Sequence, residues 1–154
     1  IVGYNLGTVT DCAAGGTVTV YSNANDYNKS SVAGGIAGYS SYVGIVTNCA
    51  ASVSVTAYSP WAASSCAGGI VGVNYGTTAP HRGMVANCAA SGSVMASASA
   101  ASYFYAGGVI GRNDANTTVT GNTYSKVATG QEYGIGYDER LNPPGPSDDG
   151  AAPR

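Results

Sequence analysis

The sequence predicts an all-β protein, a right-handed parallel β-solenoid of about four rungs with one repeat of roughly 35 residues per rung. Two observations lead to this prediction. One is an internal repeat whose copies start 34 to 39 residues apart, and the other is a composition that favours strands over helices. Residues 131–154 lie outside the repeat and are expected to form an extended, Pro/Gly-rich C-terminal tail.

The repeat has two recognisable parts, a Gly-Gly-Ile-Val-Gly run and an Asn-Cys-Ala-Ala run that follows it. The Ile-Val-Gly core occurs, with small changes, at residues 1–3, 36–38, 70–72 and 109–111. The Cys-Ala-Ala core occurs at residues 12–14, 49–51 and 88–90. A fainter copy without cysteine stands at residues 119–124. We therefore assign residues 1–130 to four units, which are residues 1–35, 36–69, 70–108 and 109–130.

The composition supports strands in all four units. Glycine accounts for 23 of the 154 residues, about twice its usual share, and leucine is nearly absent. Val, Thr, Tyr and Ser are plentiful, and they suit pleated surfaces better than helices. Because no helical segment separates the strands, a βαβ fold is excluded and stacked parallel rungs are the natural alternative.

Each unit is expected to contain three strands. In the third unit we place them at about residues 67–73, 84–90 and 92–98. Alternation is clear at residues 17–20, Thr-Val-Thr-Val, where the valines point inward and the threonines outward. Glycines mark the corners, where the backbone must turn or approach a neighbour closely.

Stacking in register brings equivalent residues of successive units into columns. One polar column is predicted at Asn5, Asn74 and Asn113, with Ser40 in the second unit, and another at Asp11, Asn48, Asn87 and Asn122. A cysteine column is predicted at Cys12, Cys49 and Cys88. Equivalent residues lie roughly 4.8 Å apart in such a stack, so two states are open: a ladder of buried thiols, or at least one disulfide, with Cys66 as a further partner.

The repeat pattern resembles the GLUG repeat of large secreted and surface-anchored bacterial proteins. That pattern reads roughly Gly-Gly-hydrophobic-Val-Gly-x-Asn, a short loop, then hydrophobic-x-Asn-Cys-(Tyr/Ala)-Ala-x-Gly-x-Val. Residues 68–94 match it nearly throughout, apart from a long loop, and residues 133–137 resemble the way such arrays close. The resemblance implies a β-solenoid scaffold located outside a bacterial cell or on its surface, and it implies no particular chemistry.

The charge pattern argues against two classes of partner. The chain carries 6 basic and 8 acidic residues, and seven of these 14 stand at or after Glu132. The repeats are thus almost uncharged, whereas nucleic-acid binding needs a basic face that neutralises phosphates. No apolar run is long enough to span a bilayer. Because the chain begins inside a repeat and without Met, we interpret it as a processed or excised piece.

No catalytic residue, metal ligand or cofactor is predicted. The only histidine, His81, has no cysteine or carboxylate at ligand spacing. Acidic residues are too sparse in the repeats for the paired carboxylates of a glycosidase. Two acidic pairs near the C-terminus, at residues 138–139 and 148–149, leave calcium binding as an alternative to a solvated tail. We therefore expect a protein that is not an enzyme.

Aromatic residues gather in the segments that vary between units, and insertions of this kind map to one face, often the binding face. The candidate ligand-binding residues are Tyr58, Trp61, Tyr103 and Tyr105. Their flat rings suit stacking against a sugar or a protein surface. This favours an adhesin module that binds a glycan or a host protein.

The ends of the stack suggest a different role, because the end rungs of a solenoid expose unpaired backbone groups unless they are capped. The candidate assembly residues are Ile1, Val2, Tyr137, Pro143 and Pro144. Head-to-tail contacts between copies, with the tail bound to the next subunit, would build a filament. A self-assembling structural protein of the bacterial cell surface or extracellular space is therefore the first functional hypothesis, and the adhesin module is the alternative.

Overall fold

A computed structural model of the chain shows an all-β protein, with one short helix in the part that it describes. The described residues are 2–22, 30–60, 64–77, 82–98 and 103–154. Successive units of the sequence add successive strands to the same four sheets, and almost every pair of neighbouring strands is parallel. The prediction of an all-β fold built on parallel pairing is confirmed.

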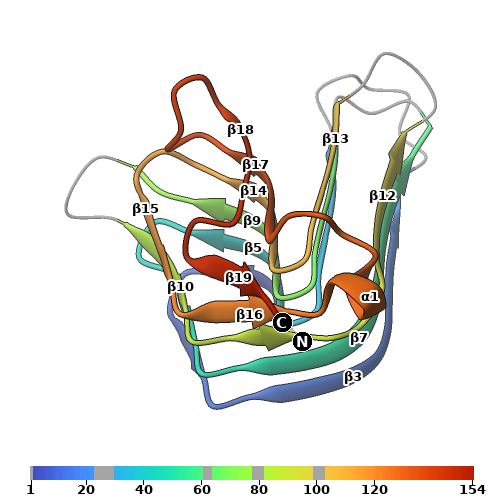
Figure 1. Cartoon of the computed structure of the whole chain (residues 1–154), viewed down its shortest axis with the longest axis horizontal. Coiled ribbons are helices and arrows are strands. Elements are labelled where there is room, and N and C mark those ends of the chain that lie inside the picture. Colours follow the sequence, from blue (N-terminus) through green and yellow to red (C-terminus); the bar gives the residue numbers. More distant parts are fainter. Residues whose placement is uncertain (1, 23–29, 61–63, 78–81, 99–102) are drawn as a thin grey trace.

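The first two sheets form two sides of the molecule (Figure 1). The first contains, in spatial order, β1 (Val2–Asn5), β5 (Ala37–Ser41), β9 (Val71–Tyr75), β14 (Ile110–Asn113), β17 (Ile135–Asp138) and β18 (Gly145–Ser147). The second contains β2 (Thr8–Thr10), β6 (Ile45–Thr47), β10 (Gly83–Ala86) and β15 (Thr117–Thr120). Only the β17–β18 pair is antiparallel among these strands.

The other two sheets form the floor and an arm. The third contains β3 (Ala13–Tyr21), β7 (Ala50–Ser59), β11 (Ala89–Ala90), β12 (Val94–Ala98), β16 (Asn122–Tyr124) and β19 (Ala151–Pro153). The fourth contains β4 (Ser30–Gly34), β8 (Ser64–Gly68) and β13 (Tyr103–Gly107). In Figure 1 the fourth sheet and the far ends of β3, β7 and β12 rise together as an arm from the base that the first three sheets surround.

Units one to three each pass through all four sheets, so each forms a rung with four sides and not the three strands predicted. The expected strand at residues 67–73 is in fact β8 and β9, which belong to different sheets. The chain bends sharply between them: a Cβ on Gly68 would lie 1.9 Å from the carbonyl oxygen of Val71, so no other residue fits. The equivalent glycines of the neighbouring units, Gly34 and Gly107, have the same tight contact, at 2.0 Å.

A second corner explains the polar residue before each cysteine. Asp11, Asn48 and Asn87 all have a φ of 54°, and Asn87 splits the expected strand 84–90 into β10 and β11. Asp and Asn tolerate this left-handed conformation better than other side chains do. In the fourth unit the corner is Gly121, with a φ of 63°, and not Asn122 as predicted. Asn122 instead lies beside Cys88, in the cysteine column, because Thr123 pairs with Ala89.

The core consists of equivalent apolar residues stacked on one another. Its largest fully buried apolar side chains are Ile36, Ile70, Ile110, Ile135, Val46, Val55, Val71, Val85, Val109 and Tyr124. Each such side chain stabilises the fold by about 1.5–3 kcal/mol relative to exposure. Because β-branched residues fill most of these positions, the same residues that favour strands also build the core.

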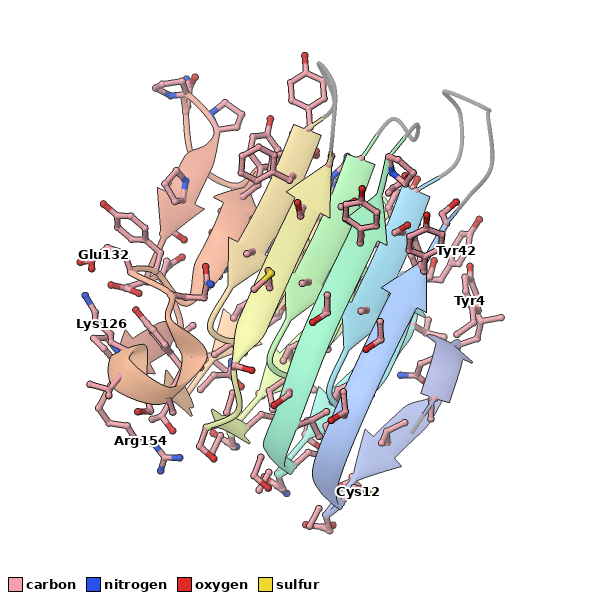
Figure 2. The ribbon with its side chains drawn as sticks, turned by 90° about the vertical axis from the view of Figure 1, so that its right-hand side faces the viewer. Tyr4, Cys12, Tyr42, Lys126, Glu132 and Arg154 are labelled. Atoms are coloured by element: carbon pink, nitrogen blue, oxygen red, sulfur yellow. The ribbon has the colours of Figure 1, made fainter. Side chains whose placement is uncertain are left out.

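The C-terminal segment corrects the prediction of an extended tail over residues 131–154. After α1 (Lys126–Thr129), strand β17 pairs with β14, β18 folds back on β17, and β19 pairs with β16. The segment therefore continues the stack of its own chain. Figure 2 shows the two ends of the stack: Tyr4 and Tyr42 lie at one end, and Lys126, Glu132 and Arg154 lie at the other.

Candidate functional site

The first predicted polar column is a row of hydrogen-bonded side chains inside the first sheet. Asn5, Ser40, Asn74 and Asn113 occupy paired positions on neighbouring strands, and each is at most 5 % exposed. Asn5 Nδ2 donates to Ser40 Oγ at 3.3 Å, and Asn74 Nδ2 donates to Asn113 Oδ1 at 2.9 Å. These bonds tie the first unit to the second and the third to the fourth, while Asn74 Oδ1 is buried without a hydrogen-bond partner.

The column has a further member that sequence reasoning missed. Asp138 on β17 is fully buried and accepts a hydrogen bond from Asn113 Nδ2 at 3.1 Å. Its carboxylate also accepts from Arg140 Nε at 2.9 Å, from Arg140 Nη2 at 2.7 Å and from Ser147 Oγ at 2.8 Å. Burial alone would raise the pKa of Asp138, but these donors outweigh it and lower the pKa below its ordinary value. The sequence did contain a signal for this position. Asp138 follows Ile135 by three residues, just as Asn113 follows Ile110 by three, and the two segments pair in the sheet.

The cysteine column is present as free thiols. Cys12, Cys49 and Cys88 each donate to the carbonyl oxygen two residues earlier, at 3.1 to 3.2 Å. Burial raises the pKa of Cys88 to about 11, so its thiol stays protonated. Cys66 is also a free thiol, and it lies on β8, away from this column. The sequence left open either a ladder of thiols or at least one disulfide, and the structure has free thiols at all four cysteines.

The predicted aromatic residues do not form one cluster. Tyr103 and Tyr105 on β13 stack at 6.3 Å between ring centroids, and Tyr105 stacks on Tyr137 of the first sheet at 4.6 Å. Tyr58 on β7 stacks instead on Tyr21 of its own sheet at 5.3 Å. Among the described residues, no ring contact joins Tyr58 to Tyr103 or Tyr105. Trp61 lies outside the described residues.

Sequence reasoning also missed an aromatic row on the first sheet. Tyr4 and Tyr39 stack at 5.3 Å between centroids, and Tyr39 lies 6.1 Å from Tyr75. The repeat spacing puts Tyr4 and Tyr39 at paired positions of β1 and β5, so the row follows the direction in which the units stack. The signal in the sequence was a tyrosine one to three residues after the Ile-Val-Gly core of each of the first three units.

A groove between the first and fourth sheets brings this row together with polar groups. A cavity of about 170 Å³ in the groove is lined by Ser30, Val32, Tyr39, Ser64, Cys66, Val73, Tyr75, Arg112 and Asp114. The two serines come from the arm and lie on neighbouring strands, with their hydroxyl oxygens 2.7 Å apart. The tyrosines come from the base. We call this space, with its nine lining residues, the inter-sheet groove.

The charged groups of the inter-sheet groove surround one guanidinium. Arg112 Nη2 donates to Glu139 Oε1 at 2.7 Å, and Arg112 Nε lies 3.4 Å from Asp114 Oδ1. Asp114 is only 5 % exposed, and burial, with a contribution from Glu139, raises its pKa to about 6 in spite of Arg112. Burial and then Asp114 raise the pKa of Tyr39 to about 12, so its hydroxyl stays protonated. The groove thus offers a carboxyl group, a guanidinium, hydroxyls and aromatic rings within one small space.

With the columns and corners established, comparison with known families is decisive for one part of the chain. The family model described as the GLUG motif matches residues 63–95. These residues are a GLUG motif. The motif begins one residue before β8 and ends at the second residue of β12, and so includes the tight Gly68 bend, the Asn74 position and the Asn87-Cys88 corner. No curated protein and no solved structure matches the chain.

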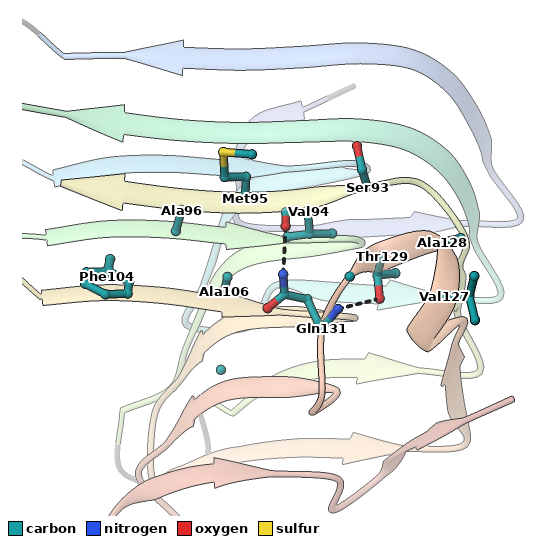
Figure 3. Close-up of a pocket in the computed structure, with 12 residues that line it drawn as sticks. Ser93, Val94, Met95, Ala96, Phe104, Ala106, Val127, Ala128, Thr129 and Gln131 are labelled. Carbon is teal, nitrogen blue, oxygen red and sulfur yellow. Dashed lines mark hydrogen bonds between the residues drawn. The ribbon is translucent and has the colours of Figure 1, made fainter.

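The last strand of the GLUG motif borders a second cavity, of about 650 Å³, at the C-terminal end of the arm (Figure 3). Strand β12 pairs with β7, and β13 pairs with β8; in the described chain neither pairs with a strand on its other side. Met95 is 60 % and Phe104 is 61 % exposed here. Gln131 Nε2 donates to the carbonyl oxygen of Val94 at 2.7 Å, which covers one group of this edge.

The predicted assembly residues fall into two groups. Val2 lies on β1, an edge strand, and Ile1 lies outside the described residues. Tyr137 is bound within its own chain by the stack with Tyr105, and Pro143 and Pro144 are exposed before β18. These three C-terminal residues therefore belong to a segment that already pairs with the repeats of its own chain.

Membrane-spanning helices and clusters of metal ligands are both absent from the described residues. Nowhere in the described chain is there a helix of the length and apolarity needed to cross a bilayer. The same residues contain no group of three His, Cys, Asp or Glu side chains placed to hold a metal ion. Of the acidic residues weighed for calcium, Asp138 and Asp149 both contact Arg140, and Asp148 accepts from Tyr124 Oη at 3.0 Å. His81 lies outside the described residues.

Proposed function

We propose that this chain is a non-enzymatic binding module of the adhesin type, which acts on the bacterial cell surface or in the extracellular space. It holds a glycan or a host protein in the inter-sheet groove. The scaffold is a right-handed parallel β-solenoid of about four rungs. Parallel, in-register pairing between successive units supports this architecture, and the GLUG motif at residues 63–95 supports the location.

The observation that carries the proposal is the composition of the groove. It combines half-buried tyrosines with a guanidinium, a buried carboxyl group and a pair of hydroxyls, all within about 170 Å³. Binding sites typically have such a mixture of apolar walls and a few convergent polar groups. Because all four units contribute side chains to the groove, with Arg112 and Asp114 coming from the fourth, the repeats act as the frame that aligns these groups.

The experiment compares binding of the intact chain and of two tyrosine variants to a glycan array and to a panel of immobilised host extracellular-matrix proteins. Tyr75→Ala removes a ring that lines the groove, and Tyr58→Ala removes a matched ring on a different sheet. Binding that is lost in the first variant and kept in the second supports the groove. Binding that is lost only in Tyr58→Ala would place the site elsewhere, and Trp61→Ala would then be tested as a third variant.

The non-enzymatic part of the proposal has its own readout. Each glycan that binds is incubated with the protein, and new reducing ends and unsaturated products are measured over a day. We expect neither to exceed the level of a buffer control. Release that disappears in Asp114→Asn would show that the groove carries catalysis and would refute this part.

Self-association is the second candidate function, because one end of the stack presents open strand edges. Strands β1, β2, β3 and β4 each pair on one side only in the described chain. Tyr4, Leu6 and Tyr21 add exposed apolar area there, between 53 % and 59 % exposed. A second copy of the chain could pair with these strands. The head-to-tail filament also needs a matching face at the other end, where α1 and β17–β19 already cover the base.

Light scattering and electron microscopy over a range of concentrations test this candidate. Copies that associate through the β1–β4 face should separate in Leu6→Lys, which puts a charge on that face. Val127→Lys is the control, since Val127 is 97 % exposed at the opposite end. An intact chain that stays monomeric at high concentration would rule out association through this face.

A further inference from the structure

One carboxyl group of the inter-sheet groove is not satisfied by its own fold. Asp114 is 5 % exposed and lines the cavity, and its Oδ1 is buried without a hydrogen bond. Arg112 Nε forms an ion pair with this oxygen at 3.4 Å, but it too is buried without a hydrogen bond. Buried polar atoms without partners are rare in native proteins, because each loses its hydration without compensation. A ligand in the cavity could supply the missing donor and acceptor.

The stability of the fold does not require this carboxyl group. Burial raises the pKa of Asp114 to about 6, so the carboxyl is mostly ionised at neutral pH but its ionisation lowers the stability of the folded chain. The equivalent position in the unit before is Tyr75, an uncharged residue, since Asn113 pairs with Asn74. A charged group that weakens the fold and lines a cavity fits a role in binding rather than in packing.

The facing wall adds neutral hydrogen-bonding groups. The Ser30 and Ser64 hydroxyls lie on the arm, and Tyr39 and Tyr75 lie on the base, so all four border the same cavity as Asp114. The three charged groups, Asp114, Glu139 and Arg112, sum to one negative charge when all are ionised. This excess opposes anionic ligands such as uronic acids.

We propose that the inter-sheet groove contains a subsite for one uncharged pyranose ring, whose adjacent hydroxyl groups donate to Asp114 and accept from Arg112. The proposal rests on the binding function proposed above and names the ligand class of that site. A vicinal diol matches the pair well, because each hydroxyl both donates and accepts, whereas the carboxylate only accepts and the guanidinium only donates. The tyrosine rings provide apolar area for the C–H groups of the ring.

The test uses ligand-detected NMR with methyl hexopyranosides and methyl glucuronide as probes, each at millimolar concentration with the intact chain. The neutral glycosides should bind, and the glucuronide should bind at least tenfold more weakly. Asp114→Asn should weaken the neutral glycosides tenfold or more, and Arg112→Lys should do the same because it loses the planar guanidinium fork. Tyr58→Ala should leave them unchanged. Circular dichroism checks that each variant is folded.

The outcomes separate this inference from the broader proposal. If glycans bind and Tyr75→Ala abolishes binding, but Asp114→Asn binds as tightly as the intact chain, the diol subsite is wrong and the groove function stands. Tighter binding of the glucuronide than of the neutral glycosides also overturns the subsite. If no array ligand depends on Tyr75, the binding function itself fails.

Discussion

Replacing Asp138 with alanine should destabilise the protein more than any other single change to its charged residues. The Asp138 carboxylate is fully buried and accepts five hydrogen bonds, from Asn113, Ser147 and three groups of Arg140. Alanine leaves those donors without their acceptor and leaves the Arg140 guanidinium, whose side chain is 16 % exposed, without its main counter-ion. Removing one partner of a buried ion pair typically costs about 3–5 kcal/mol.

The expected loss lies at the lower end of that range, about 3 kcal/mol, because Arg140 keeps a second ion pair with Asp149 at 3.3 Å. For a chain of this size each kcal/mol lowers the melting temperature by about 2–4 °C, so the variant should melt roughly 6–12 °C lower. Thermal unfolding followed by circular dichroism measures this shift. Amide hydrogen exchange should show the earliest loss of protection in β17 and β18, because Asp138 bonds β17 to Asn113 of β14 and to Ser147 of β18.

Glu132→Ala is the control, since the Lys126–Glu132 pair is exposed and should leave the melting temperature nearly unchanged. A shift below 2 °C for Asp138→Ala, or an equal shift for the control, would refute the reasoning. The pH dependence gives a second check. The pKa of Asp138 is lower in the folded chain than in the unfolded one, so its stabilisation is complete above its ordinary pKa. The difference from Asp138→Asn should therefore shrink as the pH falls through the folded pKa.

Four other changes test the corners, the groove and the thiols. Asn87→Ala should lower the free energy of unfolding in urea by about 1–2 kcal/mol, because alanine tolerates the left-handed φ of 54° poorly. Asn87→Gly should lower it much less, and equal losses would contradict the left-handed conformation of this corner. Gly68→Ala should fail to reach the native state, because its Cβ would lie 1.9 Å from a carbonyl oxygen, and a native NMR spectrum would disprove this. The pKa of Asp114 is about 6 in the folded chain, above its ordinary 3.8, so the free energy of unfolding should fall by up to about 3 kcal/mol as the pH rises from about 4 to 6. Urea unfolding measured over this pH range should show the fall in the intact chain and not in Asp114→Asn. When the folded protein is alkylated, mass spectrometry should find half-buried Cys12 modified well before Cys88, because burial raises the pKa of the Cys88 thiol to about 11. Equal rates of alkylation at the two thiols would contradict a closed cysteine column.

Repetition explains why so much of the fold was predictable. A residue such as Asn74 or Cys88 recurs at the same place in three of the four units, and parallel pairing converts that recurrence directly into a spatial column. The number of sides was harder to predict, because a run such as residues 67–73 looks like one strand. Its division depends on a bend at Gly68 that packs against the backbone of Val71 and Gly111, in the two units that follow.

The aromatic residues show where the sequence is insufficient. Tyr58 and Tyr105 occupy similar loop-flanking segments of the sequence, yet their rings contact different sheets. Which sheet a ring contacts depends on the face of the strand from which it projects and on the angle between the sheets. The length of the repeat gives information about neither. The Tyr39 row and the Asp114–Arg112 pair became a groove only because the arm folds toward the base.

The sequence alone determined the strand content, the parallel columns and the corner residues of the first three units, because these follow from local conformational preference and from the period that these units share. Only the tertiary structure decided the path of residues 131–154. Their Pro, Gly and charged residues read as an extended tail, but β17 and β19 bond to strands of the preceding unit and Asp138 completes the buried polar column. Those partners are other segments of the chain, 25 residues or more away in sequence, and a local pattern does not contain them.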